Sequence, residues 1–215
     1  MEHRKYKLGY VDEESQWISK FQRALSEAFE IEVFQLDQTI GLEDLVQKIL
    51  ASNLDCLIVD YELKETAVVP YNGDEIVDRI RQLYPYFPMF IITSKEEEYV
   101  LTQVEDNEIV RLKEELTDRP KILTQRIENK INNYYTAIEE ARKTIEDFTQ
   151  LKNNGKQLDA QQEEMLYEKY LFLEKVYPEE KILPDSLSAP ESVNVLNQFV
   201  EETRKALEEL KKLNS

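Results

Sequence analysis

The sequence predicts an α/β domain over residues 1–118, built on a five-stranded parallel sheet with helices on both faces, followed by an all-α region over residues 119–215. In the first half, short apolar runs alternate with amphipathic stretches, and strands that alternate with helices form parallel sheets. A heptad stripe occupies much of the second half. Each half is long enough to bury a modest core.

Five strands are expected, each a short run rich in apolar residues. In chain order they are Tyr6–Val11, Glu32–Leu36, Cys56–Val59, Met89–Ile92 and Ile109–Leu112. The second run alternates between polar and apolar residues, which is typical of a half-buried strand. The third and fourth runs are continuously apolar, as expected for strands that are buried on both faces of a sheet.

Amphipathic stretches separate the first four strands. The first covers residues 15–29 and places apolar side chains from Trp17 to Phe29 at spacings of three or four. The second runs from Leu42 to Leu50, and a third helix begins at Ile76. Apolar residues at these spacings share one face of a helix. Each stretch therefore supplies a crossover between parallel strands.

A different pattern begins at Asp118, a helix-capping residue type that precedes Pro120. Seven side chains then repeat at alternating spacings of four and three: Ile127, Ile131, Tyr134, Ile138, Ala141, Ile145 and Phe148. This stripe predicts one long helix over residues 119–152, and further helices are expected at about 159–177 and 190–213. Packing against the two helices that follow is the simplest role for the stripe. Pairing of two copies into a homodimer is the alternative interpretation.

The charge distribution argues against a nucleic-acid partner. The chain has a net charge of −17. Residues 1–118 carry 26 acidic and 12 basic side chains, for a net charge of −14, and residues 119–215 carry 18 and 15, for −3. Proteins that bind DNA obtain most of their affinity by neutralising phosphates with a basic surface. Neither half supplies one, so we expect no contact with DNA.

The sequence also restricts the compartment and the kinds of site. No apolar run approaches the ~20 residues that cross a bilayer, and the N-terminus has no signal-peptide core. We therefore expect a cytoplasmic protein without membrane contact. Cys56 is the only cysteine and His3 the only histidine, which excludes an internal disulfide and Cys- or His-based metal clusters.

Polar side chains follow four of the predicted strands. They are Asp12 and Glu13 after the first strand, Asp60 after the third, Thr93 after the fourth and Lys113 after the fifth. In an open parallel sheet the ligand site lies outside the carboxyl ends of the strands, so these side chains are candidates for one pocket. Mg²⁺ prefers oxygen ligands, and a lysine beside it helps to neutralise a transferred phosphoryl group. The set suits phosphoryl transfer to a carboxylate.

Four segments together resemble the receiver domain of two-component response regulators, over about residues 5–118. They are VDEE at 11–14, DCLIVDYEL at 55–63, FIITS at 90–94 and IVRLK at 109–113. The resemblance implies a flavodoxin-like fold and a regulatory domain without a catalytic residue of its own. It also implies a sensor histidine kinase or phosphotransfer protein as the phosphoryl source, and a protein target for the helical region.

The resemblance further implies a role for each polar residue. Asp60 is the phosphoacceptor by this comparison. Mg²⁺ is then held by Asp12, Glu13, Asp60 and the backbone carbonyl of Glu62. Thr93 and Lys113 contact the phosphoryl group.

Some positions depart from the family pattern. The segment Lys64–Asn72 is longer than the usual loop after the acceptor, Glu114 stands where a proline is usual, and Val110 where an aromatic residue is common. These departures support an alternative, a pseudo-receiver scaffold that is not phosphorylated. A phosphatase of the haloacid dehalogenase type is disfavoured, because its motif normally follows the first strand, whereas Asp60 follows the third.

Overall fold

The computed structural model describes residues 4–65, 68–94 and 106–184. It contains one parallel sheet of five strands in the order β2-β1-β3-β4-β5. The strands are β1 (Lys7–Val11), β2 (Glu30–Phe34), β3 (Cys56–Asp60), β4 (Met89–Thr93) and β5 (Val110–Leu112). This is the flavodoxin-like arrangement, and the predicted fold class is confirmed.

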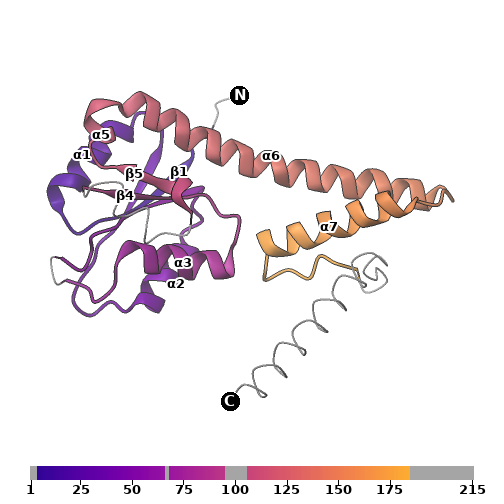
Figure 1. Cartoon of the computed structure of the whole chain (residues 1–215), viewed down its shortest axis with the longest axis horizontal. Helices are drawn as coiled ribbons and strands as arrows, with labels where there is room; N and C mark the ends of the chain where they lie inside the picture. Colours follow the sequence, from indigo (N-terminus) through magenta and orange to yellow (C-terminus); the bar gives the residue numbers. More distant parts are fainter. Residues whose placement is uncertain (1–3, 66–67, 95–105, 185–215) are drawn as a thin grey trace, which may run out of the picture. The chain divides into compact units, whose positions relative to one another are not determined.

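Helices cover both faces of the sheet (Figure 1). One face is covered by α2 (Leu42–Ala51) and α3 (Gly73–Leu83), whose buried side chains pack with those of Val11, Leu57 and Val59. The other is covered by α1 (Ser15–Leu25), the short α5 (Glu115–Asp118) and the first part of α6 (Pro120–Asn153). The central strands are buried on both sides, which explains why β3 and β4 are continuously apolar up to their last residues.

Two elements differ from the predicted ranges. Strand β2 begins two residues earlier than expected, because its pairing with β1 runs from Lys7↔Glu30 to Val11↔Phe34. As an edge strand it is only partly buried, so apolar alternation marks its register poorly. Helix α1 ends at Leu25 rather than at 29, and Phe29 is buried in the turn that leads to β2.

The chain divides into two compact units within α6, the first ending at Thr136 and the second beginning at Ala137. In the first unit, Leu123, Ile127 and Ile131 of α6 are buried against the α1 face of the sheet. The first half of the heptad stripe therefore packs on the sheet, where the sequence suggested only helical neighbours. The hydroxyl of Tyr135 donates to Asp55 beside the start of β3, which adds a polar contact between α6 and the sheet.

The second unit contains the rest of α6 and α7 (Ala160–Val176). Gly155, with φ +75°, lies just past the end of α6, as is usual for a left-handed helix C-cap. The guanidinium of Arg142 donates to the hydroxyl of Tyr177 over 3.0 Å. Within the described ranges, no helix has the length and apolarity needed to span a bilayer. The helix expected at 190–213 lies outside the described residues.

Helix α3 begins against the backbone of the third strand, and Gly73 makes this close approach feasible. A Cβ at this position would lie 2.1 Å from the carbonyl oxygen of Asp60. We expect Gly73→Ala to lower the free energy of unfolding by about 2 kcal/mol, because backbone atoms must shift to relieve the overlap. Urea unfolding followed by circular dichroism measures the change. Gly41→Ala is the control, since its Cβ would meet nothing closer than 3.7 Å. Equal stability of the two variants would contradict the prediction.

Candidate functional site

The polar residues predicted from the sequence lie together at the carboxyl end of the sheet. Asp12 directly follows β1, Asp60 and Thr93 end β3 and β4, and Lys113 directly follows β5. Their exposed fractions are 1%, 1%, 0% and 1%. Solvated strand ends would be exposed, so these side chains are instead enclosed at the end of the sheet. Among the described residues, Asp55 is the other buried polar side chain, and it precedes β3 at the opposite end of the strand.

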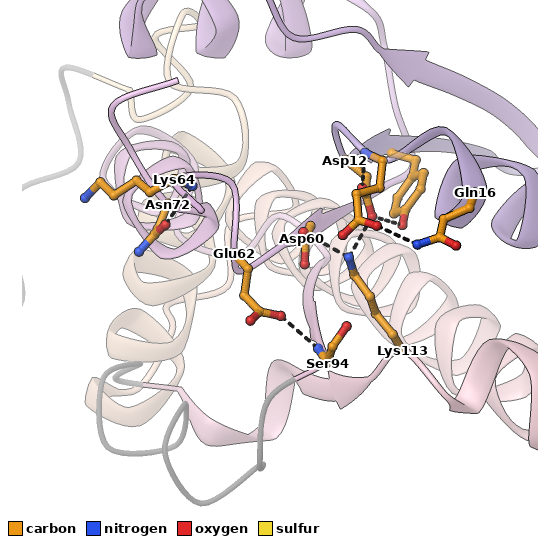
Figure 2. Close-up of polar contacts among 10 residues, drawn as sticks. Asp12, Gln16, Asp60, Glu62, Lys64, Asn72, Ser94 and Lys113 are labelled. Carbon is orange, nitrogen blue, oxygen red and sulfur yellow. Dashed lines mark hydrogen bonds and ion pairs between the residues drawn. The ribbon is translucent and has the colours of Figure 1, made fainter. Parts of the chain in front are cut away.

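Lys113 is the cation of the site and contacts two carboxylates (Figure 2). Its Nζ lies 2.9 Å from Oδ2 of Asp60 and 3.1 Å from Oδ2 of Asp12. Burial alone would lower the pKa of Lys113, but the charges of Asp60 and Asp12 outweigh it and raise the pKa above its ordinary value. The side chain is therefore an ammonium at neutral pH. A backbone bond of 2.8 Å from its N–H to the carbonyl of Thr93 fixes the residue at the end of the sheet.

Asp12 is held by three protein donors. Its Oδ1 accepts the backbone N–H of Glu14 over 2.8 Å. Its Oδ2 accepts the hydroxyl of Tyr10 over 2.5 Å and also contacts Lys113. Burial, followed by the charge of Asp12, raises the pKa of Tyr10 well above its ordinary value, so the phenol stays a donor. The orientation of Asp12 is thus set by β1, α1 and Lys113 together.

Asp60 is only partly satisfied by the protein. Its Oδ2 contacts Lys113, whereas Oδ1 is buried and accepts no hydrogen bond from the residues that the structure describes. Burial raises the pKa of Asp60 to about 7, the ammonium of Lys113 opposes the rise, and the charge of Asp12 adds to it. An oxygen in this condition requires a cation or a donor that the described residues do not supply.

The carboxylates of Asp12, Glu13 and Asp60 form a cluster that suits a hard dication. One oxygen from each lies within 4.8 Å of the other two. Among the described residues, Lys113 is the cation that contacts this cluster, and it contacts Asp12 and Asp60. Three carboxylates with one ammonium leave an excess of negative charge, and two of the three carboxylates are buried. Mg²⁺ takes oxygen ligands and would neutralise this charge. The orphaned Oδ1 of Asp60 and the chemistry of the donor set therefore fit the metal that the sequence predicted.

Glu62 uses its side chain in a way that the sequence did not indicate. Its Oε2 accepts the backbone N–H of Ser94 over 3.1 Å, and Figure 2 shows the carboxylate directed toward that residue. This contact joins the segment after β3 to the end of β4. The sequence assigned a role to the backbone carbonyl of Glu62, and that role stays a prediction.

The longer loop after Asp60 is anchored away from the acidic cluster. The backbone N–H of Lys64 donates to Oδ1 of Asn72 over 3.1 Å, and its side chain pairs with Glu75 of α3. Val69 and Tyr71 of this segment, and Leu63 directly before it, are buried in the core on the α2 and α3 face. The extra length is therefore accommodated by the core and the start of α3.

Sequence reasoning missed two aromatic residues beside the site. Tyr10 shares a strand face with Asp12, since side chains two residues apart in a strand point the same way. That spacing was available as a signal, but an apolar role in the core was the simpler expectation. Trp17, the only tryptophan in the chain, lies with its ring centroid 5.2 Å from Nζ of Lys113. Helical spacing gave no indication of this contact.

Comparison with known proteins gives a clear result for the fold. No protein-family model matches the chain, and no curated protein is significantly similar to it. Among solved structures, the signal receiver domain of an HD domain-containing protein from Pseudomonas fluorescens Pf-5 is 16% identical, with a TM-score of 0.50 over 63% of this chain and 93% of that one. The likeness shows that this part of the chain has the fold of a response-regulator receiver domain.

Two further solved structures are similar at comparable levels. A fusion protein that carries the trimeric coiled coil of yeast Spc42 is 18% identical, with a TM-score of 0.50 over 72% of this chain and 97% of that one. The non-phosphorylated receiver domain of the stress response regulator RcsB from Escherichia coli is also 18% identical, with a TM-score of 0.47 over 59% of this chain and 95% of that one.

Proposed function

We propose that this chain is a response-regulator-like signalling protein that accepts a phosphoryl group on Asp60. The observation that carries the proposal is the hydrogen bonding of the two Asp60 oxygens. Within the described part of the chain, Oδ1 of Asp60 is buried and has no hydrogen-bond partner, while its Oδ2 contacts the ammonium of Lys113. A nucleophilic oxygen beside a fixed cation, at the carboxyl end of a parallel sheet, is suited to receive a phosphoryl group. The receiver fold supports the same assignment.

The roles of the other residues follow from their positions. Asp12, Glu13 and Asp60 would hold Mg²⁺, with the backbone carbonyl of Glu62. Mg²⁺ held there would supply positive charge that offsets the negative charge of the acceptor and of the incoming phosphoryl group. The Oδ1 oxygen of Asp60 forms the bond to phosphorus, and the bond from phosphorus to the donor's leaving atom breaks, with its electron pair going to the leaving group. The leaving atom is a ring nitrogen for a phosphohistidine donor and a carboxyl oxygen for acetyl phosphate. Lys113 then pairs with a phosphoryl oxygen, and the hydroxyl of Thr93 donates to another.

The phosphoryl source in this proposal is a sensor histidine kinase or a phosphotransfer protein. The output is a protein contact made by the helical region, with the functional boundary at residue 118 and the helices beyond it as output. Helix α6 runs through the boundary between the two compact units, so one continuous helix connects them. The large acidic excess of residues 1–118 favours a protein target over DNA in the cytoplasm.

The test is intact-mass analysis after incubation with Mg²⁺ and acetyl phosphate. We expect one phosphoryl adduct on the wild type and none on Asp60→Ala, because the acceptor oxygen is gone in the variant. Titration with Mg²⁺ alone provides a second readout. We expect the emission of Trp17 to change on metal binding, since its ring faces the ammonium that contacts Asp60.

One observation favours a second candidate function, an interaction scaffold that is not phosphorylated. Asp60 and Lys113 are each only 1% exposed, so a phosphodonor reaches them only if the pocket opens. A folded wild type that forms no adduct with acetyl phosphate or phosphoramidate in Mg²⁺ would contradict the phosphoacceptor role and favour the scaffold. An adduct that persists in Asp60→Ala would place the acceptor elsewhere in the chain.

A further inference from the structure

Tyr10 and Lys113 donate to the same oxygen. The hydroxyl of Tyr10 lies 2.5 Å from Oδ2 of Asp12, and Nζ of Lys113 lies 3.1 Å from that atom. The same Nζ is closer to Oδ2 of Asp60, at 2.9 Å. The ammonium of Lys113 is thus shared between Asp12 and Asp60, and the shared oxygen of Asp12 also accepts from Tyr10.

The phenol ring of Tyr10 is fixed in place. It is fully buried, and it stacks on Phe21 of α1 with ring centroids 3.8 Å apart and planes 4° apart. The core around it is made of apolar side chains, among them Leu8, Leu25 and Ile58. A phenylalanine would fill this space equally well, so the packing gives no reason for the hydroxyl. Its contact is with Asp12, at the edge of the candidate site.

The hydroxyl of Tyr10 changes how the ammonium of Lys113 is shared between Asp12 and Asp60. Asp12 also accepts the N–H of Glu14, so with Tyr10 present both of its oxygens have a neutral donor. Without the hydroxyl, Oδ2 of Asp12 would depend on Lys113 alone, and a buried carboxylate that lacks a donor attracts the nearest cation strongly. The ammonium would then move toward Asp12 and away from Asp60.

We infer that Tyr10 is a positioning residue for phosphoryl acceptance, whose hydroxyl holds Asp12 and thereby leaves the ammonium of Lys113 against Asp60. The inference rests on the proposed function, because the position of the ammonium matters most when a phosphoryl group arrives at Asp60. Tyr10 itself does not touch that group. It acts through Asp12 and Lys113, and it lies on β1, two residues before Asp12, which directly follows that strand.

The experiment compares the full-length wild type with Tyr10→Phe, which keeps the ring and its stack on Phe21. Adduct formation is timed against acetyl phosphate concentration at saturating Mg²⁺. We expect the maximal rate to fall about tenfold, because a displaced ammonium no longer meets the phosphoryl oxygens. The donor concentration at half-maximal rate should change by less than about twofold, since the hydroxyl does not bind the donor. If the hydroxyl had only a structural role, its loss in Tyr10→Phe would lower the stability of the protein and leave the maximal rate unchanged.

Two further measurements separate positioning from folding. Phe21→Leu removes the ring stack and keeps the hydroxyl, so it should lose stability while keeping the maximal rate of the wild type. The emission of Trp17 in the metal-free protein should differ between wild type and Tyr10→Phe, because the ammonium beside its ring moves. A Tyr10→Phe protein with wild-type rate and wild-type emission would overturn the inference. If even the wild type forms no adduct, the proposed function fails, and the emission alone decides whether Tyr10 positions Lys113.

Discussion

Asp60→Asn is expected to raise the free energy of unfolding of the metal-free protein by about 2 kcal/mol at pH 8. The wild type buries the carboxylates of Asp12 and Asp60 against one ammonium, with Glu13 beside them, and burial raises the pKa of Asp60 to about 7. A raised pKa means that folding disfavours the charged form, by about 1.4 kcal/mol for each unit. Asparagine removes that penalty, although it also weakens the contact with Lys113, so the gain is smaller than the whole shift. Urea unfolding in the presence of a chelator measures it.

The gain in stability of Asp60→Asn over the wild type should increase with pH. The pKa of Asp60 lies near 3.9 in the unfolded chain and at about 7 in the folded protein. The stability contributed by protonated Asp60 is therefore complete below about pH 4 and is lost as the pH rises through 7. The advantage of Asp60→Asn over the wild type should be small below about pH 4, should grow as the pH rises from 4 to about 7, and should then level off. An advantage that is constant with pH would contradict the role of ionisation.

Mg²⁺ should reduce the stability difference between Asp60→Asn and the wild type. A ligand that binds only the folded state stabilises it by about 1.4 kcal/mol at ten times its dissociation constant. We expect this gain for the wild type and a smaller one for Asp60→Asn, which lacks one of the three clustered carboxylates. Glu27→Gln, which removes an exposed carboxylate, should respond to pH and Mg²⁺ as the wild type does.

The central part of this fold was predictable because burial leaves a direct mark on the sequence. Strands β3 and β4 are enclosed on both faces, and their apolar runs end at Asp60 and beside Thr93, within one residue of the predicted ends. Strand β2 lies at the edge, where partial exposure permits many patterns, and its range was displaced. The candidate site was predictable for the related reason that parallel strands bring their carboxyl ends to one edge.

Contacts between distant segments were not predictable in the same way. The heptad stripe of α6 indicated a buried face but did not identify its neighbour, which for Ile127 and Ile131 is the sheet. The bond from Tyr135 to Asp55 joins residues 80 positions apart, and neither residue type indicates it in isolation. Such pairs depend on how α6 is laid across the sheet, which follows from packing of the whole unit rather than from local spacing.

Lys113→Met is expected to lower the free energy of unfolding of the metal-free protein by about 3–5 kcal/mol at pH 8. Methionine fills similar space, so the loss arises from charge rather than from a cavity. The variant leaves Asp12 and Asp60 buried without their cation, and removing one partner of a buried ion pair costs about this much. Mg²⁺ should recover part of the loss, because it supplies positive charge to the same carboxylates. Phosphoryl acceptance should be strongly reduced even at saturating Mg²⁺.

The control for this prediction is a second lysine beside Trp17. Lys20→Met also removes a positive charge, but Nζ of Lys20 lies 3.7 Å from the centroid of the Trp17 ring rather than against a carboxylate. Its effect should stay below about 1 kcal/mol. The double variant Asp60→Asn with Lys113→Met should be more stable than Lys113→Met alone, since only Asp12 of the pair is then left without its cation. If the second substitution gave no recovery, the ammonium would not be acting on Asp60, and the electrostatic account of the site would be wrong.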